Sequence, residues 1–344
     1  MTSTALEVRL ASRPSGWPTD ENFEIAEVEV PTPGDGEILV RNVVMSVDPY
    51  MRGRMNDVKS YVPPFQVGAP LDGGAVGEVV TSNSPDFKPG DHVLHGLGWR
   101  DYAVVNAAHA VKVDGDLAPL STYLGVLGMP GLTAYAGLLK LGQPRAGETV
   151  VVGAATGPVG SVVGQLARIH GARAVGVAGG PEKCRALVEE LGFDAAVDRT
   201  APGFASALAA ACPRGVDVYF ENVGGELLRA VLPLLNDFAR IPLCGLVSNY
   251  SGSAKPTDPD RSAELLTTLL VKRVTLRGFV VSDFAAEEPA FRREMTEWLE
   301  AGRLRYREDL VDGLDAAPAA LIGLLQGRNF GKVVVQVAPE DQAT

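Results

Sequence analysis

The sequence predicts an α/β protein in which a β-rich domain accompanies a doubly wound parallel sheet. Short strand-like segments separated by Gly- and Pro-rich turns fill residues 1–115. From residue 148 to about residue 282 strand and helix patterns alternate, which is typical of a parallel sheet covered by helices. A length of 344 residues suits about two domains, at roughly 100–200 residues each.

The composition favours a globular, acidic protein. Apolar residues make up 46% of the chain and charged residues 21%, with a formal net charge of −11. Nucleic acids and anionic membranes attract clustered Lys and Arg, so this balance argues against both as partners. Residues Met1–Asp20 are polar and contain Pro14 and Pro18, which is unlike a secretory signal. We therefore expect a soluble, cytoplasmic enzyme that acts on a small molecule.

The cysteines and histidines predict no metal site. Cys184, Cys212 and Cys244 lie far apart and form neither a C-x-x-C pair nor a disulfide framework. His92 and His95 are three residues apart in a strand-like stretch, where they point to opposite faces. A zinc site is therefore not expected.

The first 115 residues contain six predicted strands, which suggest a barrel or sandwich. One segment, Ser46–Gly53, breaks this strand pattern with a turn at Asp48-Pro49. Loops on rigid scaffolds often carry functional residues, so Tyr50 and Arg52 are candidates for the substrate pocket. Arg52 is alternatively a surface ion-pair partner, and Tyr50 a packed aromatic. The predicted strands are Glu7–Leu10, Phe23–Val30, Glu37–Val44, Gly74–Val80, His92–Leu94 and Tyr102–Asn106.

Two further apolar residues are candidates for the substrate pocket. Trp99, with Tyr102, either walls such a pocket or belongs to the core. Met129 lies in Gly128–Tyr135, which reads as a turn opening a helix and which we interpret as a hinge between domains beside the cofactor.

The central stretch Val150–Arg173 predicts the first unit of a dinucleotide-binding fold. An uncharged β-branched strand leads into Ala155-Thr156-Gly157-Pro158-Val159-Gly160, and apolar residues then recur at helical spacing. The glycines allow the backbone to approach a pyrophosphate, and the helix N-terminus offers it free N–H groups. Because Ala155 occupies the first glycine position, the motif alone is weak, and an ordinary tight βα turn is the alternative. The flanking strand and helix favour the nucleotide-binding turn.

The alternation continues to six strands joined by five helices, which completes a doubly wound sheet. A helix Glu287–Ala301 follows, and the tail Tyr306–Leu310, Asp315–Gln326 and Lys332–Val337 is assigned to the first domain. The sheet strands are Thr149–Gly153, Ala172–Ala178, Ala195–Asp198, Val216–Glu221, Ala239–Leu243 and Thr275–Val281. The helices are Val159–His170, Pro181–Leu191, Phe204–Cys212, Gly225–Leu235 and Ala263–Lys272.

The end of the second strand favours NADP(H). NAD sites place a carboxylate there to bind the ribose 2′-hydroxyl, but this chain reads Ala178-Gly179-Gly180 and then Lys183. A lysine attracts a 2′-phosphate, and Arg199 beyond the third strand supplies a second positive charge. Lys183 is alternatively a solvated residue early in a helix, although that position is unfavourable for the helix dipole.

Ligands bind outside the carboxyl ends of parallel strands, which identifies the remaining cofactor candidates. The fourth strand ends at Asn222, and the fifth is followed by Cys244, Gly245, Ser248 and Tyr250. The end of the sixth strand, Phe279-Val280-Val281, is expected to close over the nicotinamide.

Seven stretches together resemble the zinc-free leukotriene B4 dehydrogenase/prostaglandin reductase branch of the medium-chain dehydrogenase/reductase superfamily. This branch includes bacterial curcumin reductases and plant alkenal double-bond reductases, and the resemblance covers nearly the whole chain. The stretches are Ser46–Gly53, Gly128–Tyr135, Ala154–Gln165, Ala178–Cys184, Tyr219–Glu226, Gly278–Phe284 and Gly327–Val335.

The resemblance implies a GroES-like catalytic domain (residues 1–124 and 306–344) and a Rossmann NADP-binding domain (residues 125–305). By motif position it implies that Thr156 and Gly157–Gly160 hold the pyrophosphate, and that Gly180 and Lys183 meet the 2′-phosphate. It also implies that Asn222 contacts the ribose and that Asn329 contacts the cofactor from the C-terminal segment.

Two departures from the resembling family stand out. Several members place a tyrosine before the sixth strand, where this chain reads Leu269-Leu270-Val271-Lys272. Their second cofactor-phosphate tyrosine is replaced here by Arg199.

The implied reaction is NADPH-dependent reduction of the C=C bond of an α,β-unsaturated ketone or aldehyde, bound between the domains. The developing charge on the carbonyl oxygen needs a hydrogen-bond donor, for which Tyr50 is the first candidate and Tyr250 the second. The alternatives are an NADPH:quinone oxidoreductase and a non-catalytic NADPH-binding protein. We also expect a homodimer, formed by pairing of Thr275–Val281 with its copy.

Overall fold

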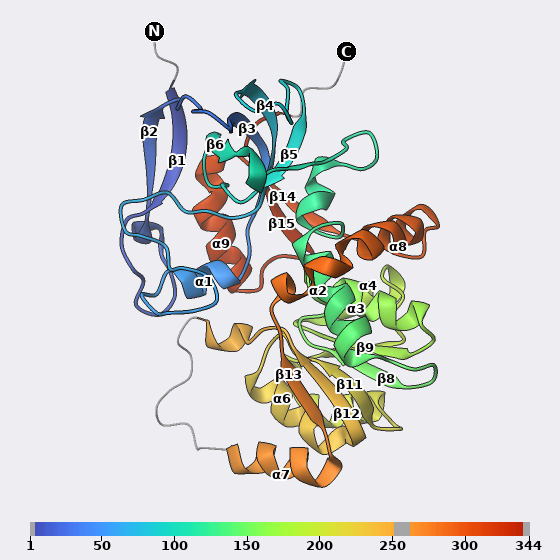
Figure 1. The fold of residues 1–344 in the computed structure, drawn as a ribbon. Coiled ribbons are helices and arrows are strands. Elements are labelled where there is room, and N and C mark those ends of the chain that lie inside the picture. The colour runs from blue at the N-terminus through green and yellow to red at the C-terminus, as the bar shows by residue number, and fades with distance from the viewer. Residues whose placement is uncertain (1–3, 251–261, 340–344) are drawn as a thin grey trace. The chain divides into compact units, whose positions relative to one another are not determined.

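The computed structural model describes residues 4–250 and 262–339. Contacts between Cα atoms divide the chain into two compact units, Met1–Leu124 with Glu308–Thr344 and Gly125–Arg307 (Figure 1). The first unit is rich in strands and the second alternates strands and helices, which confirms the predicted fold class.

The first unit is built on a mostly antiparallel sheet of seven strands. Its order is β14-β15-β3-β4-β5-β7, with β6 paired to β3, and a separate hairpin joins β1 to β2. The long central strand β3 pairs with three neighbours and is buried over most of its length. The strands are β1 (Thr4–Leu10), β2 (Phe23–Glu29), β3 (Glu37–Ser46), β4 (Ala75–Ser82), β5 (His92–His95), β6 (Tyr102–Asn106), β7 (Val111–Lys112), β14 (Glu308–Asp312) and β15 (Lys332–Gln336).

Period-two alternation along β3 divides its apolar side chains between two cores. Ile38 and Val40 belong to one cluster, together with residues of β4, β5 and β6. Met45 belongs to the other, as does Val47 just beyond the strand, and this cluster also contains the apolar face of α9 (Ala317–Leu325). The C-terminal segment thus contributes a helix and two strands to the first unit.

The second unit contains a six-stranded, wholly parallel sheet. Its order is β10-β9-β8-β11-β12-β13, so the first strand lies at the centre and the order reverses between β8 and β11. This is the doubly wound order, and it brings the carboxyl ends of β8 and β11 side by side. The strands are β8 (Thr149–Val152), β9 (Arg173–Ala178), β10 (Ala195–Asp198), β11 (Val216–Phe220), β12 (Leu235–Leu243) and β13 (Thr275–Gly278).

Helices cover this sheet. α3 and α4 pack on β8, β9 and β10, while apolar residues of α5, α6 and α7 join a core cluster with strand residues such as Val151 and Ile241. The helices of this unit are α2 (Met129–Tyr135), α3 (Pro158–Ile169), α4 (Pro181–Glu189), α5 (Phe204–Ala211), α6 (Gly225–Val231), α7 (Ser262–Lys272) and α8 (Glu288–Glu300).

Glycines allow α3 and α4 to pack closely in the layer beside the sheet. A Cβ added to Gly164 would come within 1.9 Å of the ring of Phe193, and one added to Gly176 of β9 within 2.8 Å of Leu187. Both glycines therefore leave room for larger apolar side chains that fill the helix–sheet interface.

Several elements differ from the sequence-based expectation. A short helix, α1 (Tyr50–Arg54), begins where only a turn was expected, because Pro49 at its N-cap already has helical backbone angles. Strand β13 ends at Gly278, three residues before the predicted end, and a 3₁₀ segment Val281–Glu287 follows. Strand β12 begins at Leu235, four residues early, and contains Phe238 with a φ of +62°.

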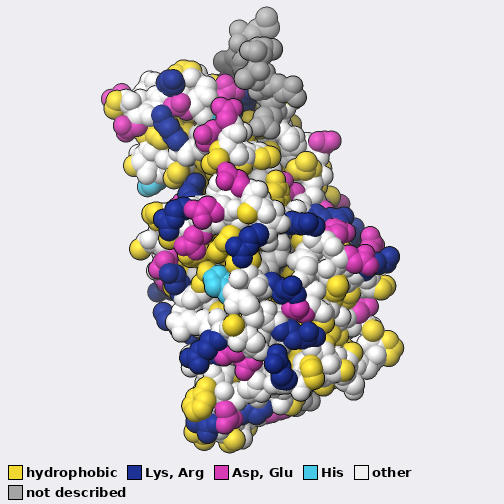
Figure 2. All heavy atoms as spheres, turned by 90° about the vertical axis from the view of Figure 1, so that its right-hand side faces the viewer, with side chains coloured by type: hydrophobic (Ala, Val, Ile, Leu, Met, Phe, Trp, Pro, Cys, Tyr) yellow, Lys and Arg dark blue, Asp and Glu magenta, His cyan; other side chains and the backbone are white. Residues whose placement is uncertain are grey.

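Within the described residues, no helix is long and apolar enough to cross a membrane. On the face drawn in Figure 2, Lys and Arg side chains are interspersed with Asp and Glu.

Candidate functional site

The turn after β8 has the geometry of a dinucleotide-binding turn. Ala154 adopts a φ of +48°, and Gly157 forms the N-cap of α3. A Cβ on Gly160 would lie 2.5 Å from the Ala154 carbonyl oxygen, so only glycine allows the helix to start this close to the strand. The first N–H groups of a helix have no hydrogen-bond partner within the helix. In α3, Val159 and Gly160 belong to this first helical turn. Such a terminus favours an anion.

The alanine at the first glycine position has a packing role. Ala155 is fully buried, and its backbone N–H donates to the Val177 carbonyl oxygen at 3.0 Å. Its methyl lies 3.0 Å from where a Cβ of Gly176 would be. The missing glycine is therefore compensated in the second strand, where Gly176 leaves space for the methyl.

The end of β9 combines free space with positive charge. Gly180 has a φ of +91° and a Cβ there would meet nothing within 4 Å, so the backbone is open on that side. Half-buried Lys183 lies in the first turn of α4. Exposed Arg199 places Nε and Nη2 each 3.6 Å from a Cβ position on Gly179.

The carboxylate of Asp198, the last residue of β10, accepts hydrogen bonds from the backbone. Oδ1 of Asp198 accepts hydrogen bonds from Gly180 N–H at 2.8 Å and from Thr200 N–H at 2.9 Å. Together with the Thr200 hydroxyl, these bonds hold the pKa of Asp198 below its ordinary value. The carboxylate shapes the turn between β9 and α4.

The ends of β11 and β12 meet at Glu221, a buried residue that the sequence analysis did not single out. Glu221 is 1% exposed, and its Oε1 accepts hydrogen bonds from the N–H groups of Val223 (2.6 Å) and Gly224 (2.8 Å). Its backbone carbonyl accepts from Cys244 (2.9 Å) and Gly245 (3.1 Å). Burial raises the pKa of the Glu221 carboxyl.

This arrangement brings five of the predicted cofactor residues together. The Asn222 amide donates to the Gly153 carbonyl oxygen at 2.9 Å, which ties β11 to the glycine turn. The Ser248 hydroxyl donates to the Val223 carbonyl oxygen at 2.5 Å, and the Tyr250 hydroxyl lies 3.2 Å from a Cβ position on Gly245. Burial and the nearby Glu221 raise the pKa of Cys244 to about 12, so its thiol stays neutral.

The segment after β13 forms an aromatic cluster. The ring of Phe279 packs edge-on against Phe220 at 6.3 Å and against Phe284 at 5.9 Å between centroids. Val280 and Val281, both half-buried, follow at the start of the 3₁₀ segment. They therefore lie in a turn beyond β13, not in the strand as the sequence suggested.

In the first unit, the candidate residues have different environments. Tyr50 opens α1 and is half-buried beside the core. Burial and the nearby Asp48 raise its pKa well above the ordinary value, so the hydroxyl keeps its proton at neutral and mildly alkaline pH.

Arg52 and Trp99 are structural. Arg52 is 2% exposed and donates to the Gly16 carbonyl oxygen (Nε at 3.0 Å) and to Asn56 (Nη1 at 2.8 Å). Burial overturns the alternative of a surface ion-pair partner, and the guanidinium nitrogens are already bonded to the Gly16 carbonyl oxygen and to Asn56. Trp99 is fully buried and stacks on Phe23, with ring centroids 6.2 Å apart. It lies in the core, which is one of the two alternatives considered above.

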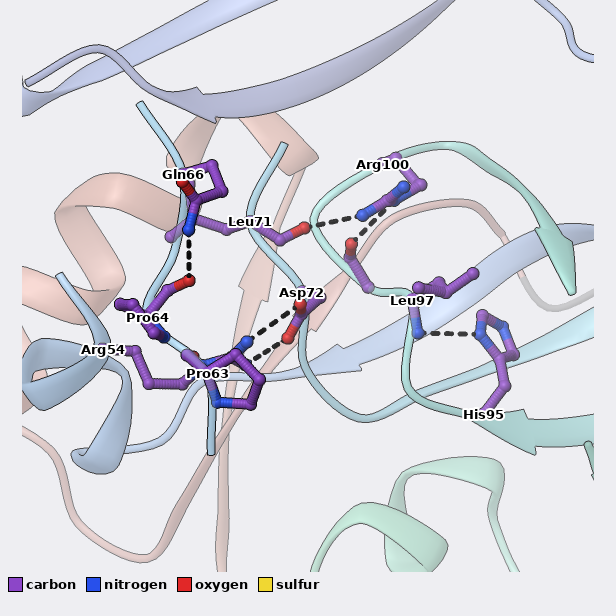
Figure 3. Close-up of polar contacts among 10 residues, drawn as sticks. Arg54, Pro63, Pro64, Gln66, Leu71, Asp72, His95, Leu97 and Arg100 are labelled. Atoms are coloured by element: carbon purple, nitrogen blue, oxygen red, sulfur yellow. Dashed lines mark hydrogen bonds and ion pairs between the residues drawn. The ribbon is translucent and has the colours of Figure 1, made fainter. Parts of the chain in front are cut away.

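A polar cluster that the sequence did not reveal surrounds α1 (Figure 3). Arg54 lies one helical turn after Tyr50 and pairs with both carboxylate oxygens of Asp72. Its guanidinium also stacks 4.0 Å over the ring of Phe65. Nearby, Arg100 donates to the Leu71 carbonyl oxygen at 2.7 Å. The cluster fixes the segment containing residues 63–72 beside α1.

His95, also shown in Figure 3, is buried and accepts a hydrogen bond from Leu97 N–H at 3.1 Å. Burial and Arg100 lower its pKa to about 3, so the imidazole is neutral.

The last two candidates are more exposed. Met129 is 41% exposed at the start of α2. Asn329 is half-buried, and its amide donates to the Gly331 carbonyl oxygen at 2.9 Å, just before β15. Across residues 4–250 and 262–339, no three His, Cys, Asp or Glu side chains are grouped so that they could hold a metal ion.

Comparisons with known proteins agree with a two-domain oxidoreductase. Residues 7–113 match the family model "N-terminal domain of oxidoreductase", and residues 158–300 match the model "Zinc-binding dehydrogenase". The chain is 53% identical to the NADPH-dependent curcumin reductase of Escherichia coli over 333 residues, 96% of each chain. It is 39% identical to bovine prostaglandin reductase 1 over 326 residues, which is 93% of this chain and 95% of that one.

A solved structure of a similar protein has the same fold. The crystal structure of CurA in complex with NADPH from Vibrio vulnificus is 49% identical, with a TM-score of 0.94. The match covers 97% of this chain and the whole of that one. This chain therefore belongs to the zinc-free branch of the medium-chain dehydrogenase/reductase superfamily that contains the curcumin and prostaglandin reductases.

Proposed function

We propose that this protein catalyses the NADPH-dependent reduction of the C=C bond of α,β-unsaturated ketones and aldehydes. The observation that carries the proposal is the end of β9, where Lys183 and Arg199 take the place of the NAD-type carboxylate. The similarity to a curcumin reductase and to an NADPH-bound CurA supports both the cofactor and the acceptor class.

The residues of the second unit would bind and orient the cofactor. The N–H groups of Val159 and Gly160 would hold the pyrophosphate, with Thr156, Gly157 and Pro158 shaping the turn. Gly180, Lys183 and Arg199 would bind the 2′-phosphate. The ribose and nicotinamide would be held by Asn222, Cys244, Gly245, Ser248, Tyr250 and Phe279–Val281, with Asn329 as a further contact.

When bound, NADPH supplies a hydride to the β-carbon of the acceptor. The π-electron pair then moves toward the carbonyl oxygen, and the α-carbon takes up a proton from solvent water. The protein has to supply a hydrogen-bond donor to that oxygen, for which we propose Tyr50 first and Tyr250 second. Met129 is proposed as an apolar residue of the substrate pocket.

We assign catalysis to residues 1–124 and 306–344 and cofactor binding to residues 125–305. We also propose that the protein acts in the cytoplasm.

An acceptor panel tests the reaction class. With NADPH, we expect turnover of enones and alkenals to their saturated carbonyl products, and slower turnover with NADH. The measurement is NADPH consumption together with product identification. Preferential turnover of quinones would replace the proposal with a quinone reductase, and tight NADPH binding without any turnover would indicate a non-catalytic protein.

The Lys183→Ala substitution tests the cofactor assignment. A charge-assisted hydrogen bond contributes about 1.5–3 kcal/mol, so the Kd for NADPH should rise roughly tenfold to a hundredfold. The Kd for NADH, which has no 2′-phosphate, should stay unchanged in a fluorescence titration. Arg185→Ala, which removes an exposed cation from the same helix, is the control. Equal weakening of both cofactors by Lys183→Ala would contradict the assignment.

Replacing each tyrosine by phenylalanine tests the donor. Loss of a positioned donor typically lowers kcat about a hundredfold to a thousandfold. We expect that loss for Tyr50→Phe, with little change in the Kd for NADPH, and a smaller loss for Tyr250→Phe. Because its pKa is raised, Tyr50 should remain a donor and cause no fall in kcat between pH 7 and pH 9. Full turnover by Tyr50→Phe would remove Tyr50 from the mechanism.

We further propose a homodimer that extends the parallel sheet. In the described part of the chain, β13 pairs with a strand on one side only, and all four of its residues are exposed. The neighbouring helix α7 exposes Leu266, Leu270 and Val271. Leu276→Pro, which disrupts the free edge, should convert a dimer to a monomer in light scattering. A wild-type chain that is monomeric at micromolar concentration would contradict the proposal.

A further inference from the structure

An ion pair buried in the first unit links two segments far apart in the sequence. Nζ of Lys332, the first residue of β15, donates to Oδ1 of Asp48 at 2.8 Å and to the Val47 carbonyl oxygen at 2.9 Å. The two charged side chains are 3% and 6% exposed. The Ser46 hydroxyl donates to the other carboxylate oxygen of Asp48.

Such a pair is poorly explained by stability alone. Removing two charges from water is unfavourable, and a buried ion pair is often no more stabilising than apolar residues of the same volume. Breaking one half is strongly destabilising, because it leaves a buried charge without a partner. A pair of this kind therefore fixes geometry more than it adds stability.

The geometry in question is the bend between β3 and α1. Strand β3 ends at Ser46, and β15 runs antiparallel beside it with Val334 opposite Ser46. The Asp48 carbonyl oxygen accepts a hydrogen bond from Met51 N–H at 3.1 Å, which closes the first turn of α1. Tyr50 lies inside that turn, so its direction follows from the position of Asp48.

The second ion pair beside α1 is more exposed to solvent than Asp48 and Lys332. The Arg54 and Asp72 side chains are 11% and 37% exposed and hold the far end of α1. Glu308, the other carboxyl group that faces Lys332, accepts a hydrogen bond from the Ser121 hydroxyl at 2.7 Å. Asp48 is thus the carboxylate to which Lys332 directly donates.

We propose that Asp48 and Lys332 are a positioning pair that sets the direction of the Tyr50 hydroxyl during reduction of the acceptor. The inference rests on the proposed function of Tyr50 and extends it to residues that touch neither substrate nor cofactor. Lys332 comes from β15, the last strand that the structure describes, so the C-terminal segment is required for the orientation of an N-terminal catalytic group.

The test is a cycle with Tyr50→Phe. The double replacement Asp48→Asn/Lys332→Met removes both charges and leaves no unpaired buried ion. We expect kcat for an enone to fall at least tenfold, with the KM for NADPH and the thermal midpoint changed little. In the Tyr50→Phe background, the same double replacement should change kcat by less than twofold, because the group that the pair positions is already absent.

Two further variants complete the design. Arg41→Met/Glu78→Gln removes a partly exposed cross-strand pair of the same unit and should leave kcat unchanged. Lys332→Arg keeps the charge with a different shape and should lower kcat several-fold while the protein remains folded. It provides the test if the double replacement fails to fold.

The outcomes separate the two proposals. A double replacement with the wild-type kcat would overturn the positioning pair. If the double replacement does not fold, a wild-type kcat in Lys332→Arg would overturn it. An equal loss of kcat in the wild-type and Tyr50→Phe backgrounds would overturn it too, while leaving Tyr50 as the donor. Full turnover by Tyr50→Phe would instead overturn the role of Tyr50, and the positioning pair with it.

Discussion

The second unit depends on the close approach of α3 to the end of β8. A side chain on Gly160 would collide with the Ala154 carbonyl oxygen, and one on Gly164 with Phe193. With glycine at position 160, the helix starts directly at the strand end, and its first N–H groups have no partner within the helix. In the same interface, the methyl group of Ala155 occupies the space that a side chain on Gly176 would need. Backbone packing thus shapes the turn at which we propose that the cofactor binds.

The strand order places the end of β11 beside the glycine turn that follows β8. Because β8 lies beside β11, Asn222 can reach the Gly153 carbonyl oxygen, and Glu221 joins β11 to the segment after β12. The first unit uses buried charge to a similar end. There Asp48 with Lys332, and Arg54 with Asp72, hold the two ends of the short helix that begins at Tyr50. In the second unit, backbone packing and hydrogen bonds fix the turn after β8. In the first unit, ion pairs fix the position of α1.

Periodic features were predictable from the sequence. Uncharged β-branched strands alternating with amphipathic helices predicted the parallel sheet, which the structure contains. Dinucleotide binding at the glycine turn and Lys183 stays a prediction. Element boundaries were less predictable where a local backbone choice decides them, as at Pro49 before α1 or Gly278 at the end of β13.

Buried polar contacts were not predictable. The side chains of Lys332 and Asp48 are 284 residues apart in the sequence, and no local pattern marks them as partners. Glu221 occupies the end of a buried strand, where a carboxylate looks anomalous until its two backbone donors are seen. Arg52 and Trp99 look like site residues because of their type, yet tertiary packing commits both to the interior.

The central claim is that hydride reaches the carbon–carbon double bond and not the carbonyl group. The most direct measurement uses NADPH deuterated at the transferred position, an enone acceptor and NMR analysis of the product. We predict a saturated ketone with deuterium on the β-carbon. An allylic alcohol with deuterium on the carbinol carbon would contradict it.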